Sequence, residues 1–278
     1  MKTEFIQSNG IKLYTISKII SEEVPTILWV HGFAEHCLRY SDIIQFFSEK
    51  GFNSIAFDLR GHGRSEGQRA YIQNFNEYLQ DLNSVRNYYE QKYPKTKWYL
   101  VGHSMGGLIV IRYHQTMLHK NHWETMVVSS PFLGVSAPVP GWKKTLSKLI
   151  VNIYPKISIP SGLNPEHISH DPKVVNDYKN DKLVLKNATA GWYEASMKAI
   201  QTAFQEIDKI QGNLHFLIAG DDKLVDANAT QSFFEKIPNE KNVTLKVYPS
   251  LYHEIFNEIE KEKVWYDLLE IFNGKEYC

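Results

Sequence analysis

The chain has 278 residues, of which 43% are apolar and 22% are charged, fractions near those of ordinary globular proteins. Its 31 Lys and Arg residues balance its 31 Asp and Glu residues, so no net field attracts nucleic acid or an anionic membrane surface. The length fits one large α/β domain, or one such domain with an insertion.

The cysteine content and the hydropathy of the chain indicate which cell compartment to expect. Cys37 and Cys278 are too few for a disulfide framework, and we expect Cys37 to be an inert buried thiol. Residues 1–5 lack the apolar core of a signal peptide, and no stretch approaches the roughly 18 consecutive apolar residues of a membrane span. We therefore expect a cytoplasmic protein that has no membrane-spanning segment and no nucleic-acid partner.

Strands and helices alternate along the first half of the chain. Short apolar runs predict strands at residues 24–31, 53–58, 98–101 and 125–129, and apolar residues at helical spacing predict helices at 40–50, at 75–93 and directly after residue 104. Such alternation implies right-handed crossovers and a mostly parallel sheet with helices on both faces. Ligands of such sheets bind at the carboxyl ends of the strands.

The alternation stops from about residue 132 to residue 204, where prolines cluster and we expect no strand. Helices are expected instead at residues 142–154, 173–180 and 189–207, because a structureless loop this long is uncommon. The pattern then resumes with strands at 215–219 and 243–248 and helices at 227–236 and 264–272. We therefore predict an α/β core in two parts, 1–131 and 207–278, with a helical lid at 132–206.

The run Gly102-His103-Ser104-Met105-Gly106 follows a predicted strand and precedes a predicted helix. This context is what the nucleophile elbow of an α/β-hydrolase requires, because two residues without a Cβ permit a tight turn that exposes the serine. The sequence therefore predicts the α/β-hydrolase fold, with Ser104 as its nucleophile.

A serine hydroxyl needs a base, and the base needs an acid that orients it. In α/β-hydrolases the acid and then the histidine follow the serine along the chain. His253 follows the last predicted strand and is the expected base. Asp221, Asp222 and Asp226 share one loop after the preceding strand; we favour Asp222, and Asp226 suits the N-cap of the next helix.

The tetrahedral intermediate of acyl transfer needs two backbone N–H donors. One is expected from Met105, the residue after the nucleophile, and the other from the loop after the first predicted core strand. That loop begins His31-Gly32-Phe33, and Phe33 is the expected donor.

Five motifs stand in order along the chain: residues 31–36 with Arg39-Tyr40 (H-G-F-A-E-H and R-Y), residues 58–67 (D-L-R-G-H-G-R-S-E-G), residues 102–107 (G-H-S-M-G-G), residues 222–226 and residues 252–254. Together they resemble the motifs of the monoacylglycerol lipase and lysophospholipase-like hydrolases, which are grouped with serine aminopeptidase S33-type sequences. The resemblance extends over nearly the whole chain and implies Ser104, His253 and Asp222 as the triad. One departure is Ala34, where the family commonly has glycine, and we expect it to have little effect.

Substrate choice is expected to depend on the lid. Its apolar residues include Leu163 and Trp192, the two expected substrate contacts, together with Trp142, Leu146, Leu149, Ile150, Ile153 and Tyr154. An apolar lid suits an acyl chain, since each buried CH₂ contributes about 0.8 kcal/mol. The same surface is expected to touch lipid aggregates transiently. No metal-ligand spacing or phosphate loop is present, so we expect no cofactor and no metal.

These observations favour a serine ester hydrolase that releases a fatty acid from a monoacylglycerol or a similar single-chain lipid. The alternatives are a lysophospholipase, a short-chain carboxylesterase, an aminopeptidase, and a hydrolase-fold binding protein without activity. A serine at the elbow disfavours dehalogenases and epoxide hydrolases, whose nucleophile is an aspartate. The sequence does not define acyl-chain length, head group or oligomeric state.

Overall fold

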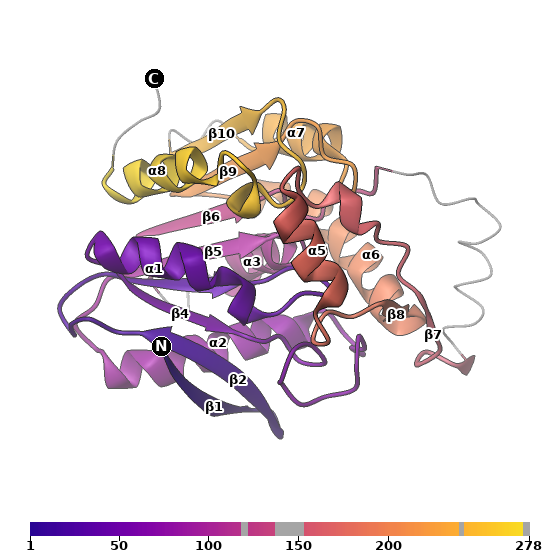
Figure 1. Cartoon of the computed structure of the whole chain (residues 1–278), viewed down its shortest axis with the longest axis horizontal. Helices are drawn as coiled ribbons and strands as arrows, with labels where there is room; N and C mark the ends of the chain where they lie inside the picture. The colour runs from indigo at the N-terminus through magenta and orange to yellow at the C-terminus, as the bar shows by residue number, and fades with distance from the viewer. Residues whose placement is uncertain (118–121, 137–152, 239–241, 275–278) are drawn as a thin grey trace.

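The computed structural model describes residues 1–117, 122–136, 153–238 and 242–274, and within them eight strands form one sheet in the order β1-β2-β4-β3-β5-β6-β9-β10 (Figure 1). The strands are β1 (Lys2–Ser8), β2 (Ile11–Lys18), β3 (Thr26–Val30), β4 (Asn53–Phe57), β5 (Trp98–His103), β6 (Thr125–Ser129), β9 (Leu214–Ala219) and β10 (Val243–Tyr248). From β4 to β10 every neighbouring pair is parallel, as the alternation of elements predicts.

The first two strands form an antiparallel hairpin, for which the sequence analysis predicted no strand. Its turn is Asn9-Gly10, and both residues have positive φ, at 46° and 84°. An Asn-Gly pair of this kind is a strong hairpin signal, because a two-residue turn needs positive φ at both central positions. The hairpin extends the sheet away from the strands that carry the predicted site residues.

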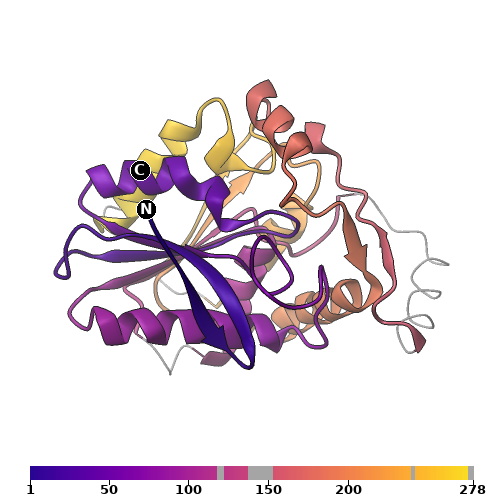
Figure 2. The same cartoon turned by 60° about the horizontal axis from the view of Figure 1, so that its bottom comes forward.

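Helices cover both faces of the sheet (Figure 2). One face packs against α1 (Ser41–Glu49) and α8 (Lys261–Phe272), and the other against α2 (Asn76–Lys92), α3 (Met105–Met117) and α7 (Ala227–Glu235). Short 3₁₀ turns are η1 (Cys37–Tyr40), η3 (Pro165–His167), η4 (Ile207–Lys209) and η5 (Ile255–Asn257). No helix among the described residues is long and apolar enough to cross a membrane.

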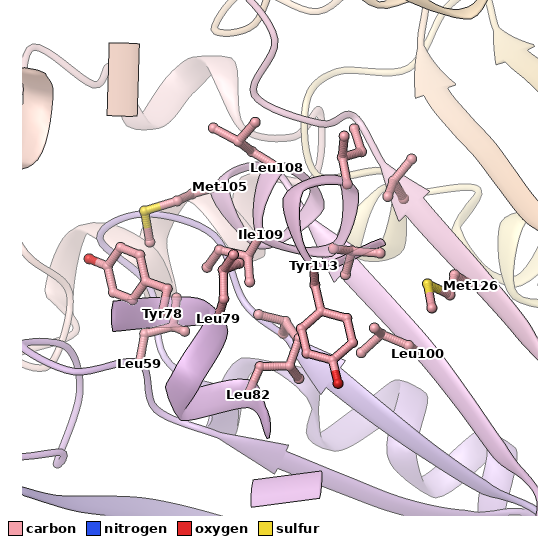
Figure 3. Packing of buried hydrophobic residues seen from close by; sticks show 14 of the residues in the cluster. Leu59, Tyr78, Leu79, Leu82, Leu100, Met105, Leu108, Ile109, Tyr113 and Met126 are labelled. Carbon is pink, nitrogen blue, oxygen red and sulfur yellow. The ribbon is translucent and has the colours of Figure 1, made fainter. Parts of the chain in front are cut away.

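The central strands are buried on both sides, which explains why they are continuous apolar runs. Along β5, Leu100 belongs to the cluster beneath α2 and α3, whereas Tyr99 and Val101 belong to the cluster beneath α1 and α8. Figure 3 shows Leu100 near Tyr113 of α3, within the first of these clusters. This two-sided packing holds the carboxyl end of β5, and therefore the turn that follows it, in a defined place.

The segment predicted as the lid lies over the carboxyl ends of the parallel strands (Figures 1 and 2). Its described elements are β7 (Ser158–Pro160), α5 (Pro172–Asn180), β8 (Asn187–Thr189) and α6 (Ala190–Gln205). The prediction that this segment contains no strand is wrong, because β7 and β8 pair antiparallel. Three-residue strands are too short to show a periodicity, so their pairing depends on contacts that are distant in sequence.

Two predicted lid helices are confirmed. Asp171 caps α5 by accepting a hydrogen bond from the Lys173 amide, and Thr189 caps α6 by accepting one from the Trp192 amide. Residues 137–152, which include Trp142, Leu146, Leu149, Ile150 and most of the helix expected at 142–154, lie outside the described residues.

Candidate active site

Ser104 lies in the turn between β5 and α3, with a φ of +54°. Its amide donates to the Ser129 carbonyl at 2.9 Å, and its carbonyl accepts from the Phe132 amide at 2.9 Å. A Cβ at Gly106 would lie only 2.2 Å from the Val30 carbonyl oxygen, so the turn can approach β3 this closely only with glycine there. The turn is strained and held by strands on both sides, as the elbow prediction requires.

The structure brings Asp222 and His253 together from two loops. Asp222 Oδ2 lies 2.7 Å from His253 Nδ1, and Asp222 Oδ1 accepts from the amides of Leu224 and Val225, each at 2.9 Å. Both side chains are buried, at 2% and 7% exposure. The aspartate is therefore held by its own loop, and it in turn orients the histidine ring.

The other two candidate aspartates have different partners. Asp226 accepts from the Asn228 amide and caps α7, as its position before that helix predicts. The exposed Asp221 pairs with Lys223. Of the three aspartates in this loop, Asp222 is the one that bonds to His253.

Burial and the attraction between Asp222 and His253 shift the pKa of both side chains. Burial disfavours the imidazolium of His253, but the Asp222 carboxylate outweighs burial, so the pKa of His253 lies above its usual value. Burial likewise opposes the charge of Asp222, yet the positive charge of His253 and its hydrogen bond lower the pKa of that carboxyl. The pair is thus suited to accept and keep a proton at His253, with Asp222 remaining ionised.

His103 lies beside this pair, with its ring centroid 4.7 Å from that of His253. Burial, followed by the charge of His253, lowers the pKa of His103 to about 3. The His103 side chain is therefore neutral near pH 7 and adds no competing positive charge beside His253.

The loop after β3 approaches the elbow closely. The Gly32 amide donates to Glu35 Oε1 at 2.6 Å, and a Cβ on Gly32 would lie 3.0 Å from Ser104 Cβ. Ala34 has a φ of +72°, which explains why glycine suits that position. Met105 is the first residue of α3, where an amide has no partner within its own helix. The backbone amides of Phe33 and Met105 remain the predicted hydrogen-bond donors to the oxyanion.

A cavity of about 450 Å³ opens above Ser104, a volume within the range of small-molecule sites. Ser104 and His253 line it together with both expected lid contacts, Leu163 and Trp192. Further lining residues that the sequence analysis did not single out are Val135, Ile159, Ile168, Tyr178, Tyr193, Leu224 and Val225. They come from separate elements, so only the tertiary structure brings them to one cavity.

The sequence analysis did not identify an ion cluster beside the cavity, although its three charged members, Glu35, Arg39 and Glu254, all lie in the motifs at residues 31–40 and 252–254. Arg39 makes two hydrogen bonds to Glu254, at 2.6 and 2.7 Å, and a third to Glu35 at 3.3 Å. Its guanidinium lies over the ring of Tyr178 in α5. Burial, offset in part by Arg39, raises the pKa of Glu35 to about 7.

Cys37 is fully buried in η1, as predicted, and its burial raises the pKa of the thiol well above its usual value. The described residues contain no group of three His, Cys, Asp or Glu side chains placed to hold a metal ion.

Comparison with known proteins gives matches over most of the chain. The family model described as serine aminopeptidase, S33 matches residues 21–260. A monoacylglycerol lipase of Mycolicibacterium smegmatis is 31% identical over 87% of this chain and 85% of its own length. An uncharacterized abhydrolase domain-containing protein of Dictyostelium discoideum is 31% identical over 89% of this chain, but this chain spans only 26% of that relative.

Among solved structures, a monoacylglycerol lipase of Paleococcus ferrophilus superposes with a TM-score of 0.82 at 29% identity. The superposition covers 93% of this chain and 97% of the other. The fold is therefore shared over nearly the full length of both chains.

Proposed function

Since the chain belongs to the serine aminopeptidase S33 family of α/β-hydrolases, we propose that it hydrolyses carboxylic esters and releases a fatty acid from a monoacylglycerol or a similar single-chain lipid ester. The observation that carries the proposal is the 2.7 Å bond from Asp222 to His253, because His253 and the strained Ser104 line the same apolar cavity.

In the proposed reaction, the Ser104 hydroxyl attacks the ester carbonyl while His253 accepts its proton. The oxyanion that forms accepts hydrogen bonds from the amides of Phe33 and Met105. His253 then protonates the leaving alcohol, and an acyl group remains on Ser104. A water molecule activated by His253 hydrolyses this acyl-enzyme, and Asp222 stabilises the imidazolium in both halves.

The cavity supports the lipid substrate class. Its wall is mostly aliphatic and aromatic, and burying each CH₂ of an acyl chain there contributes about 0.8 kcal/mol. The monoacylglycerol lipases of Mycolicibacterium smegmatis and Paleococcus ferrophilus are similar along most of this chain. The cavity wall thus favours a long acyl chain, and the two similar proteins favour a monoacylglycerol.

The charges around the cavity bear on two alternatives. A lysophospholipid carries a phosphate, yet no Lys or Arg is among the described residues that line the cavity. An aminopeptidase needs free carboxylates for the substrate amine; Glu35 and Glu254 line the cavity, but Arg39 bonds to both. The cavity therefore favours an uncharged head group such as glycerol.

We further propose that residues 132–206 act as the lid and that its outer edge touches lipid aggregates transiently. Four apolar side chains at this edge are exposed by 42% to 70%: Ile153, Tyr154, Ile157 and Ile159. Sedimentation with phosphatidylcholine vesicles tests this contact, which Ile153→Ser should weaken. The cytoplasm is the compartment we propose, supported by the free buried thiol of Cys37 and testable by fractionating cells.

The decisive experiment compares fatty acid release from monoacylglycerols and lysophosphatidylcholines of matched short, medium and long chains. We expect the long-chain monoacylglycerols to be hydrolysed fastest, and Ser104→Ala to lose at least about 10⁴-fold in rate while remaining folded. A preference for lysophospholipids would keep the triad and change the substrate class. Undiminished hydrolysis by the folded Ser104→Ala variant would refute the mechanism.

A further inference from the structure

Trp192, in the first turn of α6, contacts the side chains of both residues predicted to donate to the oxyanion. Its indole ring stacks on the Phe33 ring, with centroids 3.8 Å apart and planes 28° apart. Its Nε1–H donates to Met105 Sδ at 3.1 Å. One side chain of the lid thus bridges two loops that are adjacent to Ser104 and far from each other in sequence.

The indole has a second aromatic neighbour and is almost fully buried. The Phe132 ring is parallel to it within 1°, with centroids 6.3 Å apart, and Trp192 as a whole is only 6% exposed. Close packing on several sides leaves a large flat ring few alternative rotamers. The contacts of Trp192 with Phe33 and Met105 are therefore fixed by its surroundings.

The backbone of Trp192 is attached to the core. Thr189 Oγ1 accepts from the Trp192 amide at 3.2 Å and donates to the Ala70 carbonyl at 2.5 Å. Ala70 belongs to the loop that follows β4, so α6 begins at a point tied to the sheet. The position of the indole relative to Ser104 is therefore set by hydrogen bonds on both sides of the lid boundary.

The loop that carries Phe33 needs such support. Ala34 adopts a φ of +72°, a region that L-residues other than glycine rarely occupy. Its carbonyl accepts from the Leu185 amide of the lid segment at 2.8 Å, and His36 pairs with Asp181 at 2.8 Å. Lid residues thus hold this loop at three successive points, of which Trp192 is nearest to the predicted donor.

We propose that Trp192 is a positioning residue for the oxyanion hole: its ring holds Phe33, and its N–H holds Met105, so that both backbone amides face the same point. The lid then contributes to the chemical step and not only to binding of the acyl chain. This inference rests on the proposed ester hydrolysis, and it goes beyond the expectation that Trp192 merely contacts substrate.

The two roles of Trp192 predict different kinetics. A residue that only lines the acyl site changes KM for long-chain esters and leaves short esters unaffected. A residue that positions the oxyanion donors lowers kcat for every ester, because the same oxyanion forms whatever the chain length. An acetate ester, whose acyl group is too short to fill the cavity, separates these cases.

The experiment measures kcat and KM of Trp192→Leu and Trp192→Phe on p-nitrophenyl acetate and p-nitrophenyl palmitate. Leucine keeps apolar volume but removes both the ring stack and the N–H donor, so we expect kcat to fall about 10- to 100-fold on both esters. Phenylalanine keeps the stack but lacks the N–H donor, so its kcat should fall by only about threefold on both esters. Full kcat of Trp192→Leu on the acetate, with only KM for the palmitate raised, would overturn the proposal.

A second readout is the inhibition constant of ethylboronic acid, which forms a tetrahedral adduct on serine with an oxygen in the oxyanion hole. We expect Trp192→Leu to weaken this inhibitor by about the same factor as kcat, and unchanged inhibition would count against the proposal. If Trp192→Leu fails to fold, Trp192→Phe decides, because its missing N–H should still lower acetate kcat by about threefold.

Trp123→Leu is the matched control, since Trp123 is equally buried, at 7% exposure, and packs against Trp98 and Tyr113 instead. This variant should lose stability and keep wild-type kinetic constants while folded. A wild-type protein that hydrolyses neither ester would refute the proposed function itself, which is a result distinct from failure of this inference.

Discussion

The sheet core and the lid segment contribute different parts of the site, and they are built differently. The core carries Ser104, Asp222 and His253 on loops that follow β5, β9 and β10, strands of one mostly parallel sheet. The described part of the lid segment has two three-residue strands and the helices α5 and α6. It contacts the core through hydrogen bonds, through ring contacts, and through the packing of Ala199 and Ala203 of α6 in the core cluster.

Because of this difference, we expect substitutions in the two parts to affect hydrolysis in different ways. Changes in the core should alter the rate on every ester, whereas changes in the lid should alter which ester is preferred. Trp192 is the exception, because it belongs to the lid by sequence and to the oxyanion hole by contact.

The largest effect is expected in the core, from Asp222→Asn. The uncharged amide cannot stabilise the imidazolium, so kcat should fall about 10⁴-fold on short and long esters alike. Because the Asp222 carboxylate raises the pKa of His253, its loss should lower that pKa and move the acid limb of kcat/KM to lower pH. A pH series of initial rates measures both.

The matched control for Asp222→Asn is Asp226→Asn, four residues away. Asparagine is as good an N-cap as aspartate, so α7 should remain intact and the rate should stay at the wild-type level. A large loss in the control would mean that this loop had been disturbed as a whole.

A second core change, Gly32→Ala, should have a smaller effect that is again independent of chain length. The new Cβ would lie 2.9 Å from Glu35 Oε1 and 3.0 Å from Ser104 Cβ, so the loop must move away from the elbow. A shift of this kind can reduce kcat about 100-fold. Stopped-flow hydrolysis of an acetate ester tests it, and a loss confined to long-chain esters would contradict the assigned role of this loop.

In the lid, Leu163→Ala should change preference rather than rate. Leu163 lines the cavity, and removing its branched end should raise KM for a long-chain monoacylglycerol about tenfold, with a much smaller effect on a short one. Ile259→Ala, at a side chain 69% exposed, is the control. An equal rise in KM for both chain lengths would contradict the expected difference between core and lid.

The last prediction concerns the stability of the fold at the ion cluster and leaves catalysis aside. The pKa of Glu35 is raised from about 4.5 to about 7, so the folded protein binds a proton there that the unfolded chain releases. Stability from this group is present below pH about 4.5 and is lost as pH rises to about 7. Glu35→Gln should remove this loss, on the order of 1–3 kcal/mol, relative to wild type.

Urea unfolding at several pH values measures this difference, with the exposed Glu262→Gln as control. Parallel pH profiles for wild type and Glu35→Gln would show that Glu35 does not titrate in this range. The control should follow the wild type, because an exposed carboxyl is solvated alike in the folded and unfolded chain.

Much of the core could be predicted because its signals are local. The strand at residues 125–129 was predicted with its observed bounds, and the helix at 227–236 differs from α7 by one residue. A buried parallel strand is a continuous apolar run, so its own residues carry the signal. The hairpin of β1 and β2 was missed although its Asn9-Gly10 turn was a local signal.

The site was predicted in part. The order of Ser104, Asp222 and His253 along the chain identified the loops, because parallel strands bring their carboxyl ends to one edge. Which of three aspartates bonds to His253 depended on the conformation of one loop, where Asp226 caps a helix and Asp221 pairs with Lys223. The sequence analysis favoured Asp222 and gave Asp226 as the helix cap, and Asp222 is the aspartate that bonds to His253.

By itself, then, the sequence determined the parallel strands of the core, the elbow, and the order of the proposed triad along the chain, since each triad residue follows a strand that its own apolar run identifies. Only the tertiary structure decided the pairing of β7 with β8, the cavity wall, the Arg39 cluster and the placement of Trp192 between Phe33 and Met105. Each of these features brings together residues that are far apart in sequence. They are stabilised by close packing and burial in the folded chain, which a local sequence pattern does not predict.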